Sequence, residues 1–375
     1  MRKIILILCT VLGLVSCSKA VEITVYNKLP LNRNNELVEF CLCSVENKLN
    51  LKAGDKIIIL DKDNKKVPYQ ILSDTKTVIF PVSVAAKDSV KYRVLIGKPD
   101  SVAPKTFGRK VPERKDDFAW ESDRIAFRMY GPALALENPS NGVDVWLKRT
   151  EDLVVNKFYK DDLEKGIHYH IDHGQGLDCY KVAHTLGAGG IAPYVDKTLW
   201  VGNHYNQAEV IENGPLRTVF KLTYDTVRVG KKTVKETLLV SIDAGSQLNK
   251  ATVVYEGKAT ASMLVAAGIF LHDSIGVIKL AKDRFYIGYA EKATSDAGVP
   301  SGRSYVGVVI PSKINEAKQE GKHIIAIADY KSERPFIYYF GAGWSKWGFA
   351  SDKDWFNYLD QFAQKLRSPL EVYVK

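Results

Sequence analysis

The sequence predicts a mainly β protein, with a small N-terminal β-sandwich and a larger antiparallel β super-sandwich that contains few helices. Three observations support this fold class. Strand-like runs with alternating apolar and polar residues recur along almost the whole chain, turn signals separate them, and helical periodicity is scarce. The 375 residues also exceed what one hydrophobic core usually holds, so two domains are expected.

The first residues have the pattern of a bacterial export signal. Two basic residues precede an apolar run at 4–15, which is too short to span a bilayer but suits a signal peptide. Leu14-Val15-Ser16-Cys17 resembles a lipobox, so we expect residues 1–16 to be removed as a signal peptide and Cys17 to carry acyl chains. The alternative is an ordinary secretory signal with an incidental cysteine.

A lipidated Cys17 implies a protein held in the bacterial cell envelope, because several acyl chains anchor a protein stably. Ser18-Lys19-Ala20 carries no acidic run of the kind that directs such proteins to the cell surface. We therefore expect a position on the outer membrane, facing the periplasm, with the lipid anchor as the only membrane contact.

Residues 17–112 are predicted to form the N-terminal sandwich and a linker, and residues 113–375 the super-sandwich. Short strand-like segments separated by turns fill the first part, and the basic, proline-bearing stretch 98–115 marks the boundary. The expected strands of the first domain are 23–26, 37–43, 56–60, 77–84 and 92–96.

The second domain also consists mainly of predicted strands. Its clearest features are a long hairpin at 217–242 that turns near Gly230 and a single amphipathic helix at 352–366, with Trp355 and Leu359 on one face. The remaining expected strands are 125–130, 143–147, 251–255, 262–271, 285–289, 305–310, 324–328 and 336–340.

The composition is basic, with 53 Lys and Arg against 43 Asp and Glu, a formal net charge of +10. Loss of residues 1–16 removes Arg2 and Lys3 and no acid, which leaves +8. For an exported protein, an acidic polysaccharide is a more plausible partner than nucleic acid, although scattered lysines can also serve solubility alone. Cys41 and Cys43 lie two apart in a strand-like segment and are expected to be buried thiols, with no disulfide framework.

Chemistry-bearing residues are concentrated at 167–181. This segment holds three of the seven histidines, His168, His170 and His173, next to glycines that suit an irregular loop. Histidine exchanges protons near neutral pH, and functional residues are often found on loops. The alternative is a solvated His-rich loop with no chemical role.

The pattern His168-x-His170-x-Asp172-His173 resembles the metal-binding motif of the metallo-β-lactamase superfamily. On that resemblance the four residues would bind zinc, which would activate a hydroxide. The polar segment 160–166 that precedes the motif and the β-rich surroundings differ from that family, so the preferred interpretation has no cofactor and zinc is the alternative.

A second resemblance covers nearly the whole mature chain. The segments 112–128, 144–148 and 170–181 resemble an uncharacterised "domain of unknown function" family of exported proteins from bacterial polysaccharide-utilisation systems. The resemblance implies a galactose-mutarotase-like super-sandwich preceded by a small β domain. It also implies a role close to uronate glycans of the pectin or ulvan type, including oligosaccharide dehydration.

Elimination from a uronate suits the residues of the 167–181 segment. The site must neutralise the substrate carboxylate, remove the weakly acidic proton at C5 and protonate the oxygen that leaves C4. The expected assignments are the following: Lys181 and Arg217 bind the carboxylate, His170 or Tyr180 is the base, His173 is the acid, and Asp178 orients a ring nitrogen.

Sugar rings also stack on aromatic side chains, so Trp146, Trp344 and Trp347 are candidate platforms. Core positions are the alternative for these tryptophans and for Tyr180, and Lys148 is expected at the surface. The sequence thus predicts a lyase or dehydratase acting on uronic-acid oligosaccharides. A hydrolase or epimerase that uses Glu209, Glu212 or Glu236, a zinc hydrolase and a non-catalytic glycan-binding lipoprotein are the alternatives.

Overall fold

The computed structural model describes residues 19–375 except 138–140, 258–259, 261–262 and 274. The expected signal peptide and Cys17 lie outside the described residues. The described chain is mainly β, with five sheets whose paired strands are antiparallel, so the predicted fold class is confirmed. No helix in the described part of the chain is long and apolar enough to cross a membrane.

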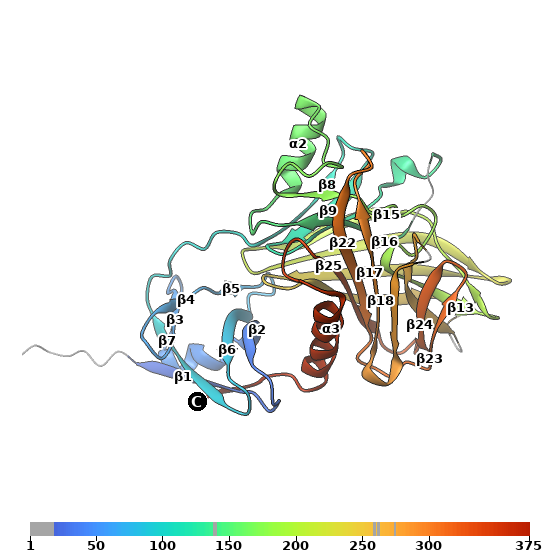
Figure 1. Cartoon of the computed structure of the whole chain (residues 1–375). Helices are drawn as coiled ribbons and strands as arrows, with labels where there is room; N and C mark the ends of the chain where they lie inside the picture. The colour runs from blue at the N-terminus through green and yellow to red at the C-terminus, as the bar shows by residue number, and fades with distance from the viewer. Residues whose placement is uncertain (1–18, 138–140, 258–259, 261–262, 274) are drawn as a thin grey trace, which may run out of the picture.

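Two sheets face each other in the N-terminal sandwich, at the left of Figure 1. One has the strand order β26-β1-β7-β3-β4 and the other β2-β6-β5. Their alternating strands bury one apolar face each, which includes Ile23, Phe80 and Val94. The strands are β1 (Ala20–Tyr26), β2 (Arg33–Cys41), β3 (Ile57–Leu60), β4 (Lys66–Val67), β5 (Gln70–Ile71), β6 (Thr77–Val84), β7 (Ser89–Ile96) and β26 (Glu371–Val374).

The last strand of the chain belongs to the N-terminal sandwich. β26 pairs antiparallel with β1, with Ile23 opposite Val374, so the two ends of the described chain close one sheet. This pairing was not expected from the sequence, because nothing local to 371–374 shows which sheet edge the strand will join.

The expectation for Cys41 and Cys43 was wrong. The two residues form a disulfide, and both are exposed. The extended segment ends at Cys41, and Cys43 begins the short helix α1 (Cys43–Leu49), so the two side chains do not follow the alternation of one continuous strand.

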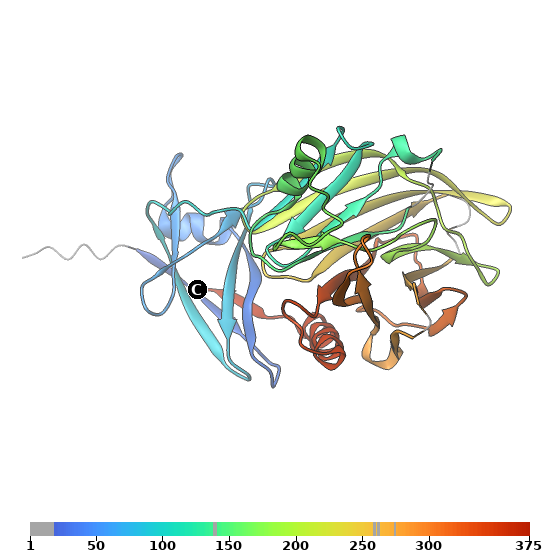
Figure 2. The same cartoon turned by 45° about the horizontal axis from the view of Figure 1, so that its top comes forward.

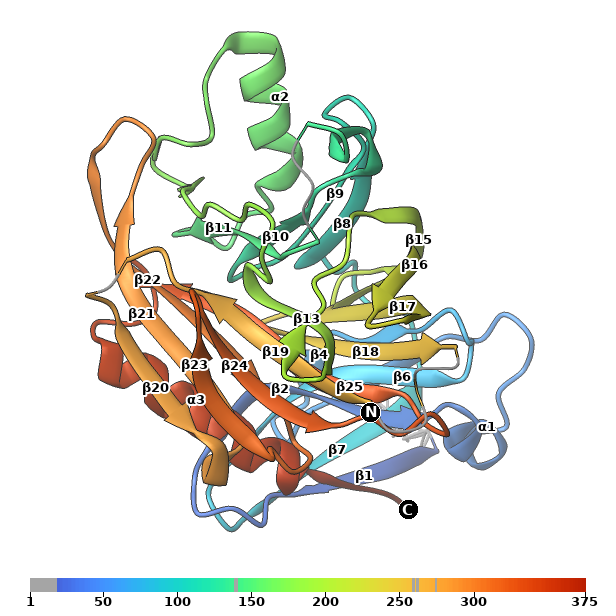
Figure 3. The ribbon, with the colours of Figure 1, turned by 90° about the vertical axis from the view of Figure 1, so that its right-hand side faces the viewer.

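A five-stranded sheet with the order β12-β11-β10-β9-β8 carries helix α2 (Val155–Lys165) on its outer side (Figures 1 and 3). α2 was not expected from the sequence. Trp146, Phe158 and Tyr159 pack between the helix and the sheet. The strands are β8 (Thr106–Val111), β9 (Asp117–Ser122), β10 (Ala126–Met129), β11 (Asp144–Lys148) and β12 (Gly176–Asp178).

An eight-stranded sheet has the order β15-β16-β17-β18-β25-β22-β21-β20, and a five-stranded sheet has the order β14-β13-β19-β24-β23. The main core lies between them and the β8–β12 sheet. The strands are β13 (Ala188–Val195), β14 (Thr198–Leu199), β15 (Tyr205–Asn213), β16 (Arg217–Val229), β17 (Lys232–Asp243), β18 (Leu248–Glu256), β19 (Leu264–Phe270), β20 (Val277–Ala281), β21 (Tyr286–Thr294), β22 (Pro300–Val309), β23 (Glu316–Glu320), β24 (His323–Asp329) and β25 (Phe336–Trp344).

Two local predictions in this region are confirmed. The long hairpin is β16 and β17, which turn at Gly230. The predicted helix is α3 (Asp352–Arg367), which buries Trp355 and Leu359 against β21 and β22 and lies beside the N-terminal sandwich in Figure 2. Two short 3-10 helices, η1 (Pro132–Leu134) and η3 (Lys282–Arg284), complete the described elements.

Candidate functional site

The histidine-rich segment lies at the open edge of the β8–β12 sheet. It forms a turn at 168–173 and then enters β12, whose Asp178 lies opposite Trp146 of β11. Gly176 has a φ of +136°, and a Cβ there would lie 2.0 Å from the carbonyl oxygen of Leu147. Glycine is therefore required where the turn meets the sheet.

Beneath this turn the sheet buries a cluster of charges around Arg128 of β10. Arg128 is 1% exposed, and its Nη2 lies 2.8 Å from Oδ2 of Asp178 and 2.5 Å from Oδ2 of Asp144. Its Nη1 donates to the hydroxyl of Tyr169 at 3.0 Å, and its Nη2 donates to the hydroxyl of Tyr130 at 3.2 Å. Arg128 and Asp144 are direct cross-strand neighbours, so the pairing of β10 with β11 brings the two charges together.

The two carboxyl groups hold protons more tightly than ordinary aspartates. Burial, and then the neighbouring charge of Asp178, raises the pKa of Asp144 to about 7. Burial raises the pKa of Asp178 to about 6, against the opposing effect of Arg128. Such shifts are concentrated at functional sites in proteins, although ion-pair networks also produce them.

His170 connects the buried charges to solvent. Its side chain is 34% exposed, and its Nδ1 lies 3.1 Å from the carbonyl oxygen of Asp178 and 3.5 Å from the Oδ2 of the same residue. Asp296, in the turn between β21 and β22, lies 3.8 Å from this nitrogen. We refer to His170 and Asp178 as the His–Asp dyad.

A second histidine and carboxylate pair contacts the segment that follows Asp178 in the sequence. His272 places Nδ1 2.7 Å from Glu291 of β21 and Nε2 2.6 Å from the carbonyl oxygen of Lys181. Burial alone would lower the pKa of His272, but the hydrogen bond and the charge of Glu291 raise it on balance. Because both ring nitrogens are engaged, His272 anchors the start of the loop that follows β12.

The other predicted catalytic residues occupy different settings. His173 is exposed, and its Nε2 donates to the carbonyl oxygen of His168 at 3.1 Å, within the same turn as His170. Tyr180 is 6% exposed and packs on the ring of His272. Burial raises the pKa of Tyr180 well above its usual value, so this hydroxyl is a core group and not the accessible base that was expected. Lys181 is exposed and follows Asp178 of the dyad by three residues in the sequence.

Three predicted substrate-binding residues have structural roles. Trp146 is 0% exposed under α2, and Trp344 is 1% exposed and donates from its indole to the carbonyl oxygen of Ser301. Buried ring faces cannot stack on a sugar, so both platform assignments are corrected. Arg217 pairs with Asp243 and with Glu39, which lies in β2 of the N-terminal sandwich.

Trp347 was predicted to be a platform for a sugar ring, and Lys148 was predicted to lie at the surface. Trp347 is partly exposed, with the guanidinium of Arg124 over its ring, and remains a possible contact surface. Lys148 is not at the surface: it is 1% exposed and lies 2.7 Å from the buried Glu121. Glu121 also accepts from the backbone N–H groups of Val154 and Val155 at the start of α2.

The residues of the zinc alternative point to separate partners. His168 bonds Asp162 of α2, Asp172 pairs with Arg149, and His170 faces Asp178. Among the described residues, no three His, Cys, Asp or Glu side chains form a group that could hold a metal ion. This arrangement does not fit the metal set that the motif implies.

The three glutamates considered for hydrolysis are not brought together. Glu209 is exposed and pairs with Lys221, and Glu212 accepts a hydrogen bond from Gln70 of β5 in the N-terminal sandwich. Glu236 lies in the core, where burial raises its pKa to about 8.

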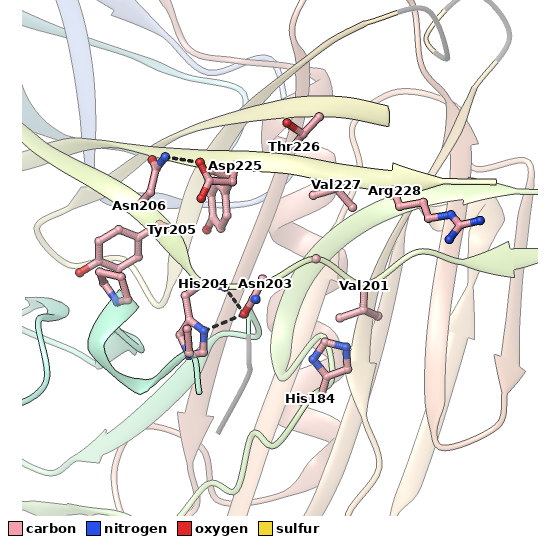
Figure 4. A pocket seen from close by; sticks show the side chains of 14 residues that line it. His184, Val201, Asn203, His204, Tyr205, Asn206, Asp225, Thr226, Val227 and Arg228 are labelled. Atoms are coloured by element: carbon pink, nitrogen blue, oxygen red, sulfur yellow. Dashed lines mark hydrogen bonds between the residues drawn. The ribbon is translucent and has the colours of Figure 1, made fainter. Parts of the chain in front are cut away.

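Two hollows open elsewhere on the molecule. A pocket of about 420 Å³ lies between η1, the segment 201–206 and β16 (Figure 4). A groove of about 880 Å³ lies between the N-terminal sandwich, the eight-stranded sheet and α3, and includes the Arg217 ion pairs. Both fall in the range of small-molecule sites.

A family model described as "Domain of unknown function (DUF4861)" matches residues 25–372. The chain belongs to the DUF4861 family. It is also 31% identical over 282 residues to "Uncharacterized protein P7" of Formosa agariphila, an alignment that covers 72% of this chain and 70% of the relative. The predicted resemblance to a domain-of-unknown-function family is thus confirmed.

The fold of this DUF4861 chain is similar to part of a larger solved structure. A protein in the glycosyl hydrolase family 38 from Enterococcus faecalis matches 95% of this chain at 9% identity, with a TM-score of 0.50. An α-mannosidase from Enterococcus faecalis V583 matches with a TM-score of 0.45 at 8% identity. The chain spans about half the length of each (47% and 46%), so the likeness concerns the fold alone.

Arg128 and Asp144 are the site residues that sequence reasoning missed, although a signal was present. Each is a charged residue inside an apolar strand, between Phe127 and Met129 and between Val143 and Val145. If both faces of the strand are covered, such a charge is buried and needs a partner. The pattern does not identify that partner, because the pairing requires the register of the two strands.

Proposed function

We propose that this DUF4861 protein acts on uronic-acid-containing oligosaccharides by β-elimination, as a lyase or dehydratase, with His170 as the general base. The observation that carries the proposal is the His–Asp dyad. It joins a partly exposed imidazole to a buried carboxyl group, which pairs with Arg128, and Arg128 in turn pairs with Asp144. The fold likeness to part of a protein in the glycosyl hydrolase family 38 supports a carbohydrate as the substrate class.

The dyad geometry determines which nitrogen of His170 can act. The carbonyl oxygen of Asp178 only accepts hydrogen bonds, so Nδ1, 3.1 Å away, carries the proton of the neutral ring. Nε2 then holds the free lone pair and can take a proton from a substrate. The same bond fixes the orientation of the ring, as required of a positioned base.

In the proposed reaction Nε2 of His170 removes the proton at C5 of the uronate. The electron pair of the C5–H bond forms the C4=C5 double bond, and the C4–O bond breaks. The departing oxygen takes a proton from His173, the exposed histidine of the same turn. Lys181, an exposed cation three residues after Asp178, neutralises the substrate carboxylate, on which negative charge builds as the proton leaves.

The burial of Asp144 and Asp178 argues against a hydrolase that uses these two carboxyl groups directly. Glycoside hydrolysis requires both groups to reach the scissile bond, and the side chains of Asp144 and Asp178 are 0% and 2% exposed. The two aspartates therefore support His170 from below and do not contact substrate.

The direct experiment is incubation of the purified protein with a panel of uronate oligosaccharides, followed by mass spectrometry. Loss of one water from a substrate, or cleavage into an unsaturated product without gain of water, is the expected result. Gain of water indicates a hydrolase and no mass change indicates an epimerase or a binding protein, and each of these results contradicts the proposal.

Chelation separates the proposal from the zinc alternative. If His168, His170 and His173 bound a metal together, a chelator would inactivate the protein and each substitution would lower its metal content. We expect turnover to persist in chelator. Stoichiometric zinc in the purified protein, with equal loss of activity from all three alanine substitutions, would contradict the elimination mechanism.

We also propose that Cys17 carries the lipid anchor and that the protein faces the periplasm from the outer membrane. Replacement of Cys17 by alanine should move the protein from the membrane fraction to the soluble fraction of cells. An unchanged distribution of the variant would contradict lipidation at this residue.

A further inference from the structure

We propose that the pocket between η1 and β16 binds an anionic sugar unit, and that it holds a part of the oligosaccharide that does not react. This inference rests on the proposed function for its substrate class. The pocket (Figure 4) has a volume of about 420 Å³, and its contacts identify the ligand chemistry independently of the dyad.

The basic group of the pocket is Arg228 of β16. Its Nε donates to the carbonyl oxygen of Gly230 at 3.0 Å, which holds the guanidinium at the end of the hairpin. Within the described chain, no carboxylate lies within ion-pair distance of Arg228, whereas Arg217 on the same strand is paired with both Asp243 and Glu39. The Nη1 and Nη2 donors of Arg228 can therefore bind a carboxylate or a sulfate ester of a ligand in a forked arrangement.

The other side of the pocket presents amide and carboxylate groups held by hydrogen bonds. Nδ2 of Asn206 donates to Oδ1 of Asp225 at 2.6 Å, which leaves Oδ2 of Asp225 as an acceptor. Oδ1 of Asn203 accepts from the backbone N–H of His204 at 2.9 Å, which leaves the NH₂ group of Asn203 as a donor. Figure 4 shows Asn203, Asn206 and Asp225 on the side of the pocket away from Arg228.

These groups together match a charged sugar. Each sugar hydroxyl both donates and accepts, so it is satisfied by adjacent acceptors such as Asp225 and donors such as Asn203. A neutral sugar would use this side of the pocket alone and leave Arg228 without an anion. An anionic unit uses both sides, which is the basis for the choice of ligand.

The pocket lies close enough to the dyad to serve the same chain of sugars. His184 lines the pocket, and it follows Asp178 by only six residues. Six extended residues span at most about 20 Å, so the Cα atoms of Asp178 and His184 are no farther apart than a short oligosaccharide is long. The pocket would thus bind one unit while the dyad acts on another.

The test measures binding by calorimetry in the full-length His170→Ala protein, which keeps the pocket but lacks the proposed base. The probes are a galacturonate trisaccharide, the neutral galactose trisaccharide and a sulfated galactose trisaccharide. We expect the galacturonate probe to bind at least about tenfold more tightly than the neutral probe. Tighter binding of the sulfated probe than of the galacturonate would identify sulfate as the source of the anion, and equal binding of all three would overturn the proposal.

Two charge variants locate the binding. Arg228→Gln in the same background should weaken binding of the favoured anionic probe about tenfold or more. Lys231→Gln is the matched control, because Lys231 is exposed in the same hairpin turn but does not line the pocket, and this variant should bind like its parent. Equal weakening by both variants would show a general charge effect, and no weakening by Arg228→Gln would place the ligand elsewhere. Both results contradict the proposal.

The outcome is independent of whether the proposed reaction occurs. If the parent protein changes no substrate but the Arg228-dependent binding is found, the proposed function fails and the pocket assignment stands. If the parent turns over uronates and Arg228→Gln has unchanged affinity and KM, the pocket assignment fails and the proposed function stands.

Discussion

The N-terminal sandwich and the β8–β12 sheet are both small antiparallel assemblies, but their interiors differ in kind. The sandwich core is apolar, and Arg33 is the one charged side chain that the described part of this domain buries to below 9% exposure. The β8–β12 sheet buries six charged residues to 1% exposure or less: Asp117, Glu121, Arg128, Asp144, Lys148 and Asp178.

The apolar interior of the N-terminal sandwich serves folding alone, whereas the charged interior of the β8–β12 sheet also positions the side chains of the candidate site. A buried ion pair is seldom more stable than well-packed apolar residues of similar size, because desolvation offsets the attraction. The burial of the Glu121–Lys148 pair has a structural reason, because Glu121 accepts hydrogen bonds from the backbone at the start of α2. The Arg128 cluster, by contrast, reaches the partly exposed His170 through Asp178.

The largest effect expected from this comparison is on stability. Arg128→Met leaves Asp144 and Asp178 buried without their cation, so the free energy of unfolding should fall by about 3–5 kcal/mol. Urea unfolding followed by fluorescence measures the change. Arg93→Met, at an exposed arginine of the N-terminal sandwich that bonds Asn64, is the control and should cost well under about 1 kcal/mol. Similar losses in the two variants would remove the distinction between the regions.

The next effect is a dependence of stability on pH. The pKa values of Asp144 and Asp178, about 7 and about 6, are higher in the folded protein than in an unfolded chain. An acid with a raised pKa stabilises the fold fully below its unfolded pKa, and this contribution is lost as the pH rises through the folded pKa.

Between pH 4 and pH 8 these two groups should therefore lower the free energy of unfolding by several kcal/mol, since each unit of difference in pKa corresponds to about 1.4 kcal/mol. Denaturant unfolding across this range measures the slope. The Asp144→Asn variant has no ionisable side chain at position 144, so its free energy of unfolding should depend less steeply on pH. The idea fails if the slope is the same in the variant and the parent.

The smallest effect expected lies in the N-terminal sandwich. The Cys41–Cys43 disulfide closes a loop of only a few residues, so in the chain-entropy account it stabilises the fold by only about 1–2 kcal/mol. Replacement of both cysteines by serine should lower the melting temperature slightly and leave turnover unchanged. A loss as large as that of Arg128→Met would mean that the disulfide, and not the apolar core, holds this domain.

The sequence predicted correctly those elements whose signals are contained in one short segment. The α3 helix and the β16–β17 hairpin were foreseen because their periodicity and turn residues are complete within one segment. Helix α2 was missed because Val154 supplies no side-chain cap, and the capping carboxylate, Glu121, comes from β9.

The same reasoning explains what could be predicted of the site. The segment 167–181 stood out by its histidines and glycines, and the structure brings His170 and Asp178 together. The burial of Trp146, Trp344 and Lys148 depends on which sheet faces are covered, and sequence alternation alone does not show this. The pairing of Arg128 with Asp144 requires the register of β10 and β11, which no local pattern supplies.

The central claim is that His170, held by Asp178, is the base. Turnover of the best uronate substrate by His170→Ala and His168→Ala tests it most directly, because both histidines lie in one turn and both contact an aspartate, but only His170 joins the buried cluster. His170→Ala should lower kcat by about a hundredfold or more, the range of a positioned acid or base, while His168→Ala stays near the parental value. Equal losses in the two variants, or a fully active His170→Ala protein, would contradict the account.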